Sequence, residues 1–139
     1  MIVDTSVLLA ASIRGQQQHA PCRALLSAAR SLVVSPLVLA EIDYFAARIA
    51  GVDAELAILD ELGSGMFELA PFERVDLIRA RAVIERYRDL RLGLTDASLV
   101  VLAHRHGTHQ IATLDERHFR VVRSLTGQPF TLLPADLPE

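Results

Sequence analysis

The chain has 139 residues, of which 51% are hydrophobic and 22% charged, so it can bury a core and is not a disordered tail or linker. Its net charge is −3 and every basic residue is an arginine, so no overall positive field indicates a nucleic-acid binder. The single cysteine, Cys22, excludes an internal disulfide and a cysteine-rich metal site.

The opening segment does not predict a membrane or secreted protein. No apolar run reaches the roughly 18 residues of a membrane-spanning helix, and Met1-Ile2-Val3-Asp4 has an acid where a signal peptide has basic residues. We therefore expect a cytoplasmic protein. The few aromatic residues argue against a base-stacking sheet, so any nucleic acid bound here is expected to be held by its backbone.

The first part of the chain alternates between short β-branched runs and amphipathic stretches. We predict strands at residues 1–3, 32–34 and 66–69. We predict helices at residues 7–13, 21–30, 36–50 and 53–62. Pro21 suits the first turn of the second helix, and Gly51 and Gly63 end the third and fourth helices.

The second part of the chain continues this alternation. It predicts helices at residues 73–90 and 95–106, a strand at 110–114 and a last edge strand at 130–133. Strands that alternate with helices predict a parallel sheet with helices on its faces. We expect one α/β domain that spans residues 1–139, without repeats or linkers.

Two acids follow predicted strands directly. Asp4 ends the first strand and Asp115 ends the strand at 110–114. Ligands of open parallel sheets bind beyond the carboxyl ends of the strands, so these positions suit a functional site. Aspartate is also a preferred helix N-cap, and for each residue taken alone a capping role is the stronger interpretation.

Two further acids lie on predicted helices. Asp96 begins the apolar stripe of its helix, where an unpaired carboxylate would be costly, so it either caps the helix or needs a cation. Glu41 and Asp43 flank opposite sides of the stripe Val38, Ile42, Phe45 and Ile49, so periodicity does not choose between them. A solvated edge, or a pair between Glu41 and Arg48, is the simplest interpretation of Glu41 alone.

The four acids together indicate a function more strongly than any one of them alone. Carboxylates that share one edge of a sheet repel one another unless a cation compensates their charge. Oxygen ligands favour Mg²⁺ or Mn²⁺, and such ions lower the pKa of water and neutralise a phosphate. A cluster of Asp4, Asp96 and Asp115, with Glu41 reaching in, would therefore suit a phosphodiester substrate.

Four segments together resemble the PIN-domain family, specifically its short VapC-type ribonuclease toxins. Order and spacing agree over almost the whole chain. The segments are a hydrophobic run into Asp4-Thr5-Ser6, then Ser35-Pro36 leading into Ala40-Glu41, then Leu94-Thr95-Asp96-Ala97 with Ala103, and Ala112-Thr113-Leu114-Asp115 with Phe119.

The resemblance implies a three-layer α/β/α fold and a metal-dependent endoribonuclease, the toxin of a toxin–antitoxin pair. Its catalytic and metal-binding acids correspond to Asp4, Glu41, Asp96 and Asp115, which selects Glu41 over Asp43. The implied cofactor is Mg²⁺ or Mn²⁺, and water activated by the metal attacks the phosphorus directly. The implied substrate is tRNA or rRNA, and the implied partners are a cognate antitoxin and a second copy of the chain.

The resemblance also implies supporting residues. Ser6 and Thr113 match the hydroxyl positions near the first and last acids, where they orient the substrate or the acids. Arg117, together with Arg91, is a candidate for holding the scissile phosphate because arginine forms bidentate phosphate contacts. Glu116 is not counted as a ligand, which leaves a second metal site incomplete.

Two other functions are weaker interpretations. A phosphatase that uses Asp4 as its nucleophile would need a second acid at Ser6 and a lysine, which the chain lacks. A module that binds RNA or a partner without catalysis on the same fold is the alternative. It would gain nothing from four carboxylates that face a polyanion.

Overall fold

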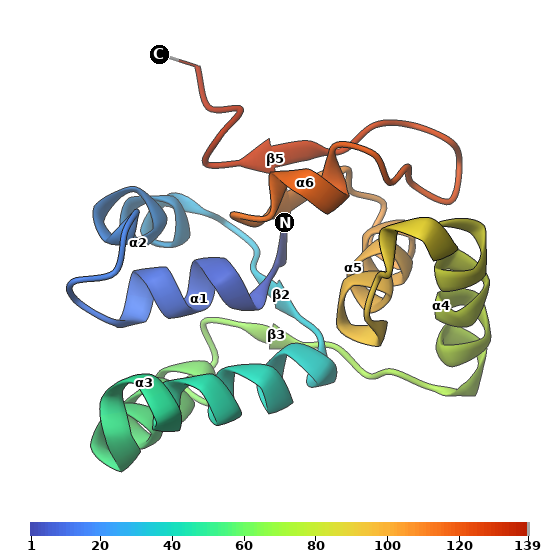
Figure 1. Cartoon of the computed structure of the whole chain (residues 1–139). Helices are drawn as coiled ribbons and strands as arrows, with labels where there is room; N and C mark the ends of the chain where they lie inside the picture. Colours follow the sequence, from blue (N-terminus) through green and yellow to red (C-terminus); the bar gives the residue numbers. More distant parts are fainter. Residues whose placement is uncertain (139) are drawn as a thin grey trace.

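Five short parallel strands form the centre of the fold in the order β3-β2-β1-β4-β5 (Figure 1). The computed structural model describes residues 1–138. The strands are β1 (Ile2–Val3), β2 (Val33–Val34), β3 (Glu68–Leu69), β4 (Gln110–Ala112) and β5 (Thr131–Leu133). The order places β1 in the middle of the sheet, so the residues that follow Val3 lie at the centre of the sheet's carboxyl edge.

In the part of the chain that the structure describes, six α-helices flank the sheet. They are α1 (Thr5–Ser12), α2 (His19–Ala28), α3 (Pro36–Leu62), α4 (Arg74–Arg86), α5 (Leu94–Arg105) and α6 (Glu116–Phe119). Helix α1 packs against α2 and α3, and α4 packs against α5. Figure 1 shows these two groups on opposite sides of the strands, which confirms the α/β/α layers expected from the sequence.

The core lies where β1, β2 and β4 meet α5. Residues 97–103 of α5 are all buried, and so are both residues of β1 and both of β2. Strands of a parallel sheet are covered on both faces, which explains their run of β-branched and aliphatic side chains. The first turn of α5 is thereby fixed at the carboxyl edge of the sheet.

The expected apolar stripe of the helix at residues 36–50 was wrong in its second half. Val38, Ile42 and Ala46 form the buried face, whereas Phe45 is 40% and Ile49 is 49% exposed. A four-residue step continues the face from Ile42 to Ala46, and the small alanine permits close packing. Two large apolar side chains are therefore left on the surface of α3.

Gly51 interrupts α3 as the sequence predicted. Its backbone has φ 85° and ψ 176°, a conformation that favours glycine, so the long helix consists of two segments joined at a kink. The predicted helix at 73–90 is instead α4 followed by a separate 3₁₀ turn, Arg88–Leu90. Strand β4 ends at Ala112, two residues early. The Thr113 amide still donates to the Leu133 carbonyl, but the Leu114 and Asp115 amides donate to side-chain hydroxyls instead of continuing the sheet.

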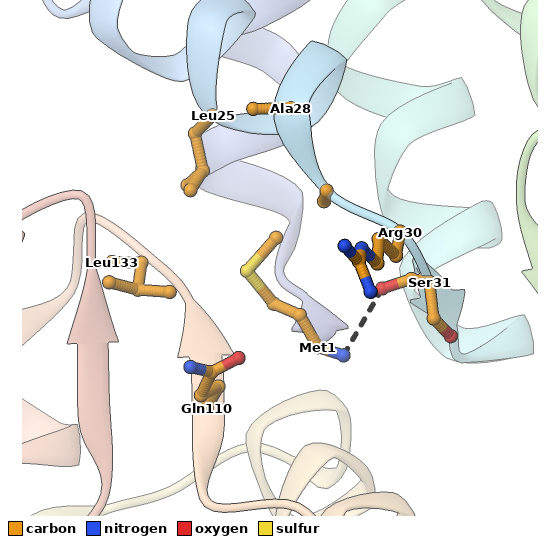
Figure 2. Close-up of a pocket in the computed structure, with 8 residues that line it drawn as sticks. Met1, Leu25, Ala28, Arg30, Ser31, Gln110 and Leu133 are labelled. Atoms are coloured by element: carbon orange, nitrogen blue, oxygen red, sulfur yellow. Dashed lines mark hydrogen bonds between the residues drawn. The ribbon is translucent and has the colours of Figure 1, made fainter.

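No helix within residues 1–138 combines the length and the apolar character needed to cross a membrane. A hollow of about 390 Å³ lies beside Met1 and Gln110, at the amino ends of β1 and β4 (Figure 2). The Met1 amine donates a hydrogen bond of 3.2 Å to the carbonyl oxygen of Ser31 there. No carboxylate among residues 1–138 lines this hollow, so the acids singled out in the sequence lie elsewhere.

Candidate functional site

A second hollow, of about 270 Å³, brings the four acids together. Its carboxylates come from four separate places in the fold: the end of β1, helix α3, the first turn of α5 and the start of α6. These residues are Asp4, Glu41, Asp96 and Asp115. The two strand-end acids sit beyond the carboxyl ends of the central strands β1 and β4, where parallel sheets place their ligands.

Asp4 is buried at the end of β1 and caps α1. Its Oδ1 accepts the Thr5 amide at 2.7 Å, and its Oδ2 accepts the hydroxyls of Thr113 at 2.7 Å and Ser6 at 3.2 Å. Burial raises the pKa of Asp4, and the three hydrogen bonds oppose that rise. Capping and membership of the cluster are therefore not alternatives here, because one side chain does both.

Ser6 and Thr113 connect the first acid to the last. The Ser6 hydroxyl accepts the Leu114 amide at 3.0 Å, and the Thr113 hydroxyl accepts the Asp115 amide at 3.0 Å. Each hydroxyl also donates to Asp4. The two side chains thus fix the turn after β4 against the end of β1, and they set the distance between two carboxylates.

Glu41 reaches the hollow from α3. Its Oε1 accepts the Thr5 hydroxyl at 2.7 Å, and no contact joins it to Arg48. Arg48 donates instead to the Tyr44 hydroxyl at 2.6 Å. Asp43 does not line the hollow. The contact with Thr5 thus distinguishes Glu41 from Asp43, which helical periodicity alone could not do.

His118 joins the acids and was not identified from the sequence. Ligand atoms of Asp96, Asp115 and His118 all lie within 4.8 Å of one another. The His118 Nδ1 is 3.0 Å from Asp115 Oδ2 and 3.5 Å from Asp96 Oδ2, yet it is buried without an aligned hydrogen bond. The available signal was the spacing in Asp115-Glu116-Arg117-His118, which places the first and last side chains on one face of a turn.

The pKa of Asp96 is raised as well. Burial, followed by the charges of Asp4 and Asp115, raises the pKa of Asp96 to about 6, and the proximity of His118 partly opposes this. A nearby cation would stabilise the ionised form of this carboxylate at neutral pH. The hollow therefore holds negative charge at an energetic cost that a bound ion would remove.

The donor set fits a divalent cation. Carboxylate oxygens favour Mg²⁺ or Mn²⁺, and one imidazole nitrogen is compatible with Mn²⁺. The buried, unpartnered Nδ1 of His118 beside two carboxylates is the donor arrangement that an ion would complete. Glu116 points elsewhere, since its Oε2 pairs with Arg120 at 2.7 Å.

The two candidate phosphate ligands lie on the surface. Arg117 lies on α6 between Asp115 and His118, and Arg91 follows the 3₁₀ turn with φ 53°. Both side chains are exposed, and neither has an acidic partner within residues 1–138.

Replacement of Thr113 by valine is expected to destabilise the protein by about 2 kcal/mol, because it removes a buried donor to Asp4 and the acceptor of the Asp115 amide. Urea unfolding measures the change. Thr131→Val, which alters a threonine exposed on the edge strand β5, should leave the free energy of unfolding close to wild type. Equal losses in both variants would contradict a special role for Thr113.

Comparison with known proteins gives a family and several similar folds. The sequence profile of the PIN domain matches residues 1–124. Ribonuclease VapC26 of Mycobacterium tuberculosis is 46% identical over 135 residues, covering 96% of this chain and 100% of that protein.

Two solved structures share the fold. VapC20 of Mycobacterium tuberculosis, a Sarcin-Ricin loop cleaving toxin, superposes with a TM-score of 0.77 at 20% identity, covering 82% of this chain and 88% of that one. A toxin–antitoxin complex from Klebsiella pneumoniae gives a TM-score of 0.66 at 19% identity, covering 87% and 91%.

Proposed function

We propose that this chain, which belongs to the PIN domain family, is a VapC-type ribonuclease that hydrolyses RNA phosphodiester bonds with the help of a divalent cation. The observation that carries the proposal is the convergence of Asp4, Glu41, Asp96 and Asp115 on one hollow. The full-length similarity to Ribonuclease VapC26 supports the same activity.

The residues of the site would have distinct roles in the reaction. Asp4, Asp96 and Asp115 would hold Mg²⁺ or Mn²⁺, with Glu41 and His118 at the margin of the same site. Such an ion lowers the pKa of the attacking water and neutralises charge on the phosphate. Ser6 and Thr113 would hold the carboxylates of Asp4 and Asp115 in fixed relative positions through their hydrogen bonds.

The substrate phosphate needs positive charge from the protein as well. Arg117 is exposed two positions after Asp115 and has no acidic partner within residues 1–138, so it is free to form a bidentate phosphate contact. Direct attack by water on the phosphorus would leave a 5′-phosphate and a 3′-hydroxyl. The ribose 2′-hydroxyl would take no part.

Two relations to other molecules belong to the proposal. A similar fold occurs in the toxin–antitoxin complex from Klebsiella pneumoniae, which supports a cognate antitoxin as partner of this chain, and a homodimer is proposed with it. VapC20 is named for cleaving the sarcin-ricin loop, which supports a structured RNA, rRNA or tRNA, as the target class.

Incubation of the purified protein with cellular RNA tests the proposal. The reactions contain Mg²⁺, Mn²⁺ or a chelator, and sequencing of the cut ends records their position and chemistry. We expect cuts that depend on the metal and carry 5′-phosphates. Retention of RNA on the protein without cutting in any metal would support the non-catalytic binding module instead.

A further inference from the structure

Helix α3 presents two aromatic side chains beside the acids. Tyr44 is 54% and Phe45 is 40% exposed, and within residues 1–138 no other tyrosine or phenylalanine is exposed. They follow Glu41 by three and four positions, so the three side chains share one side of the helix. The scarce aromatic residues of this chain are thus concentrated on the surface at the edge of the site.

A hollow of about 350 Å³ lies between these aromatics and the start of α5. It is lined by Leu37, Ala40, Glu41, Tyr44, Phe45 and Thr95. Glu41 and Phe45 also line the hollow that contains the acids, so the two hollows adjoin. An RNA strand whose phosphate is held at the acids would therefore have its next base within reach of the aromatic hollow.

The aromatic side chains are held in place. The rings of Tyr44 and Phe45 meet edge to face, with centroids 5.3 Å apart at 75°. The Arg48 guanidinium lies 5.2 Å from the Tyr44 ring centroid and donates to the Tyr44 hydroxyl at 2.6 Å. Arg48 has no acidic partner within residues 1–138, so its charge is available to a phosphate.

We propose that the Tyr44–Phe45 pair is a stacking platform for a nucleobase in an unpaired segment of RNA adjoining the cleaved phosphate: the base stacks on one ring, the other ring supports that ring edge to face, and Arg48 contacts the neighbouring backbone. The inference rests on the proposed ribonuclease function and deepens it. Aromatic faces stack with any base, and a guanidinium adds both charge and a planar surface. The proposal differs from the expectation that RNA is held by its backbone alone, which was drawn from the small number of aromatic residues; the structure shows that two of these residues are exposed beside the acids.

A protein partner is the competing occupant, since Ile49, Val52 and Leu56 continue an exposed apolar surface along α3. The hollow itself favours RNA. Glu41 and Thr95 line it, and an apolar protein segment would strip water from the Glu41 carboxylate without replacing its hydrogen bonds. The amino and imino groups of a base can donate to such a carboxylate.

Binding to a fluorescent, unstructured RNA oligonucleotide tests the platform. All proteins contain Asp4→Asn so that the RNA stays intact. Combined Tyr44→Leu and Phe45→Leu keep an apolar surface but remove the aromatic faces, and we expect about tenfold weaker binding. An oligonucleotide of the same length with abasic riboses should bind with equal affinity to the leucine variant and to the protein that retains Tyr44 and Phe45. Tyr44→Trp should retain binding, and Ile49→Ser, on the same helix, is the matched control.

The outcomes separate the inference from the proposed function. Unchanged RNA affinity in the leucine variant, or an equal loss with the abasic RNA, would overturn the platform while metal-dependent cutting by the wild-type chain still stands. A change in oligomeric state on size-exclusion chromatography in the leucine variant would identify a protein interface and would also overturn it. If the wild-type chain neither cuts nor binds RNA, the ribonuclease proposal itself fails.

Discussion

Asp4→Asn is expected to reduce RNA cleavage by at least about 100-fold without unfolding the protein. A carboxylate has about four acceptor positions, and hydrogen bonds from Thr5, Ser6 and Thr113 occupy three of those of Asp4. The remaining position and the negative charge face the hollow. Asparagine retains the shape but loses the charge and half of the acceptors, so a cation would be held weakly.

Asp43→Asn is the matched control for this measurement. Asp43 lies on α3 two positions from Glu41 but outside the hollow, so the substitution removes one charge near the site without touching it. Cleavage is followed with labelled RNA in Mg²⁺ or Mn²⁺, and circular dichroism checks the fold of each variant. Cuts that persist in Asp4→Asn at the wild-type rate would show that this cluster does not perform the reaction.

The positions of Asp4 and Asp115 at the ends of strands could be predicted from the sequence because their signals are local. Asp4 and Asp115 each follow a short β-branched or aliphatic run, and the structure places both at the carboxyl edge. Parallel topology requires only that strands alternate with helices, and this pattern extends along most of the chain. The α/β class and the central parallel sheet could therefore be predicted without any tertiary contact.

The rest of the site depends on contacts that no local pattern contains. Helix α6 has four residues, too few for a periodic signal, and His118 was missed with it. Glu41 was separable from Asp43 only through the resemblance, and in the structure it is marked by Thr5, which is 36 positions away. Phe45 was expected in the core because its spacing fits, but Ala46 occupies that face.

Asp96→Asn is expected to stabilise the metal-free protein by about 2 kcal/mol at pH 7.5. The roughly two pKa units between the folded and unfolded states correspond to about 2.7 kcal/mol, and solvent screening at the partly exposed Asp96 lowers this value. The pKa of Asp96 is raised to about 6, above its unfolded value near 4. Below pH 4 the carboxyl is neutral in both states and costs nothing. Between pH 4 and 6 the unfolded chain loses this proton while burial and the neighbouring acids keep it on the folded state, so wild-type stability falls until both states are ionised above about pH 6.

The advantage of the asparagine variant should therefore appear between pH 4 and 6 and stay constant above, as measured by urea unfolding in chelator. Saturating Mg²⁺ or Mn²⁺ should reverse the order, since an ion at one hundred times its dissociation constant adds about 2.7 kcal/mol to the protein that binds it. Asp60→Asn, exposed on α3, should change neither quantity. If neither ion changes the melting temperature of the wild-type protein, the four carboxylates do not form a cation site.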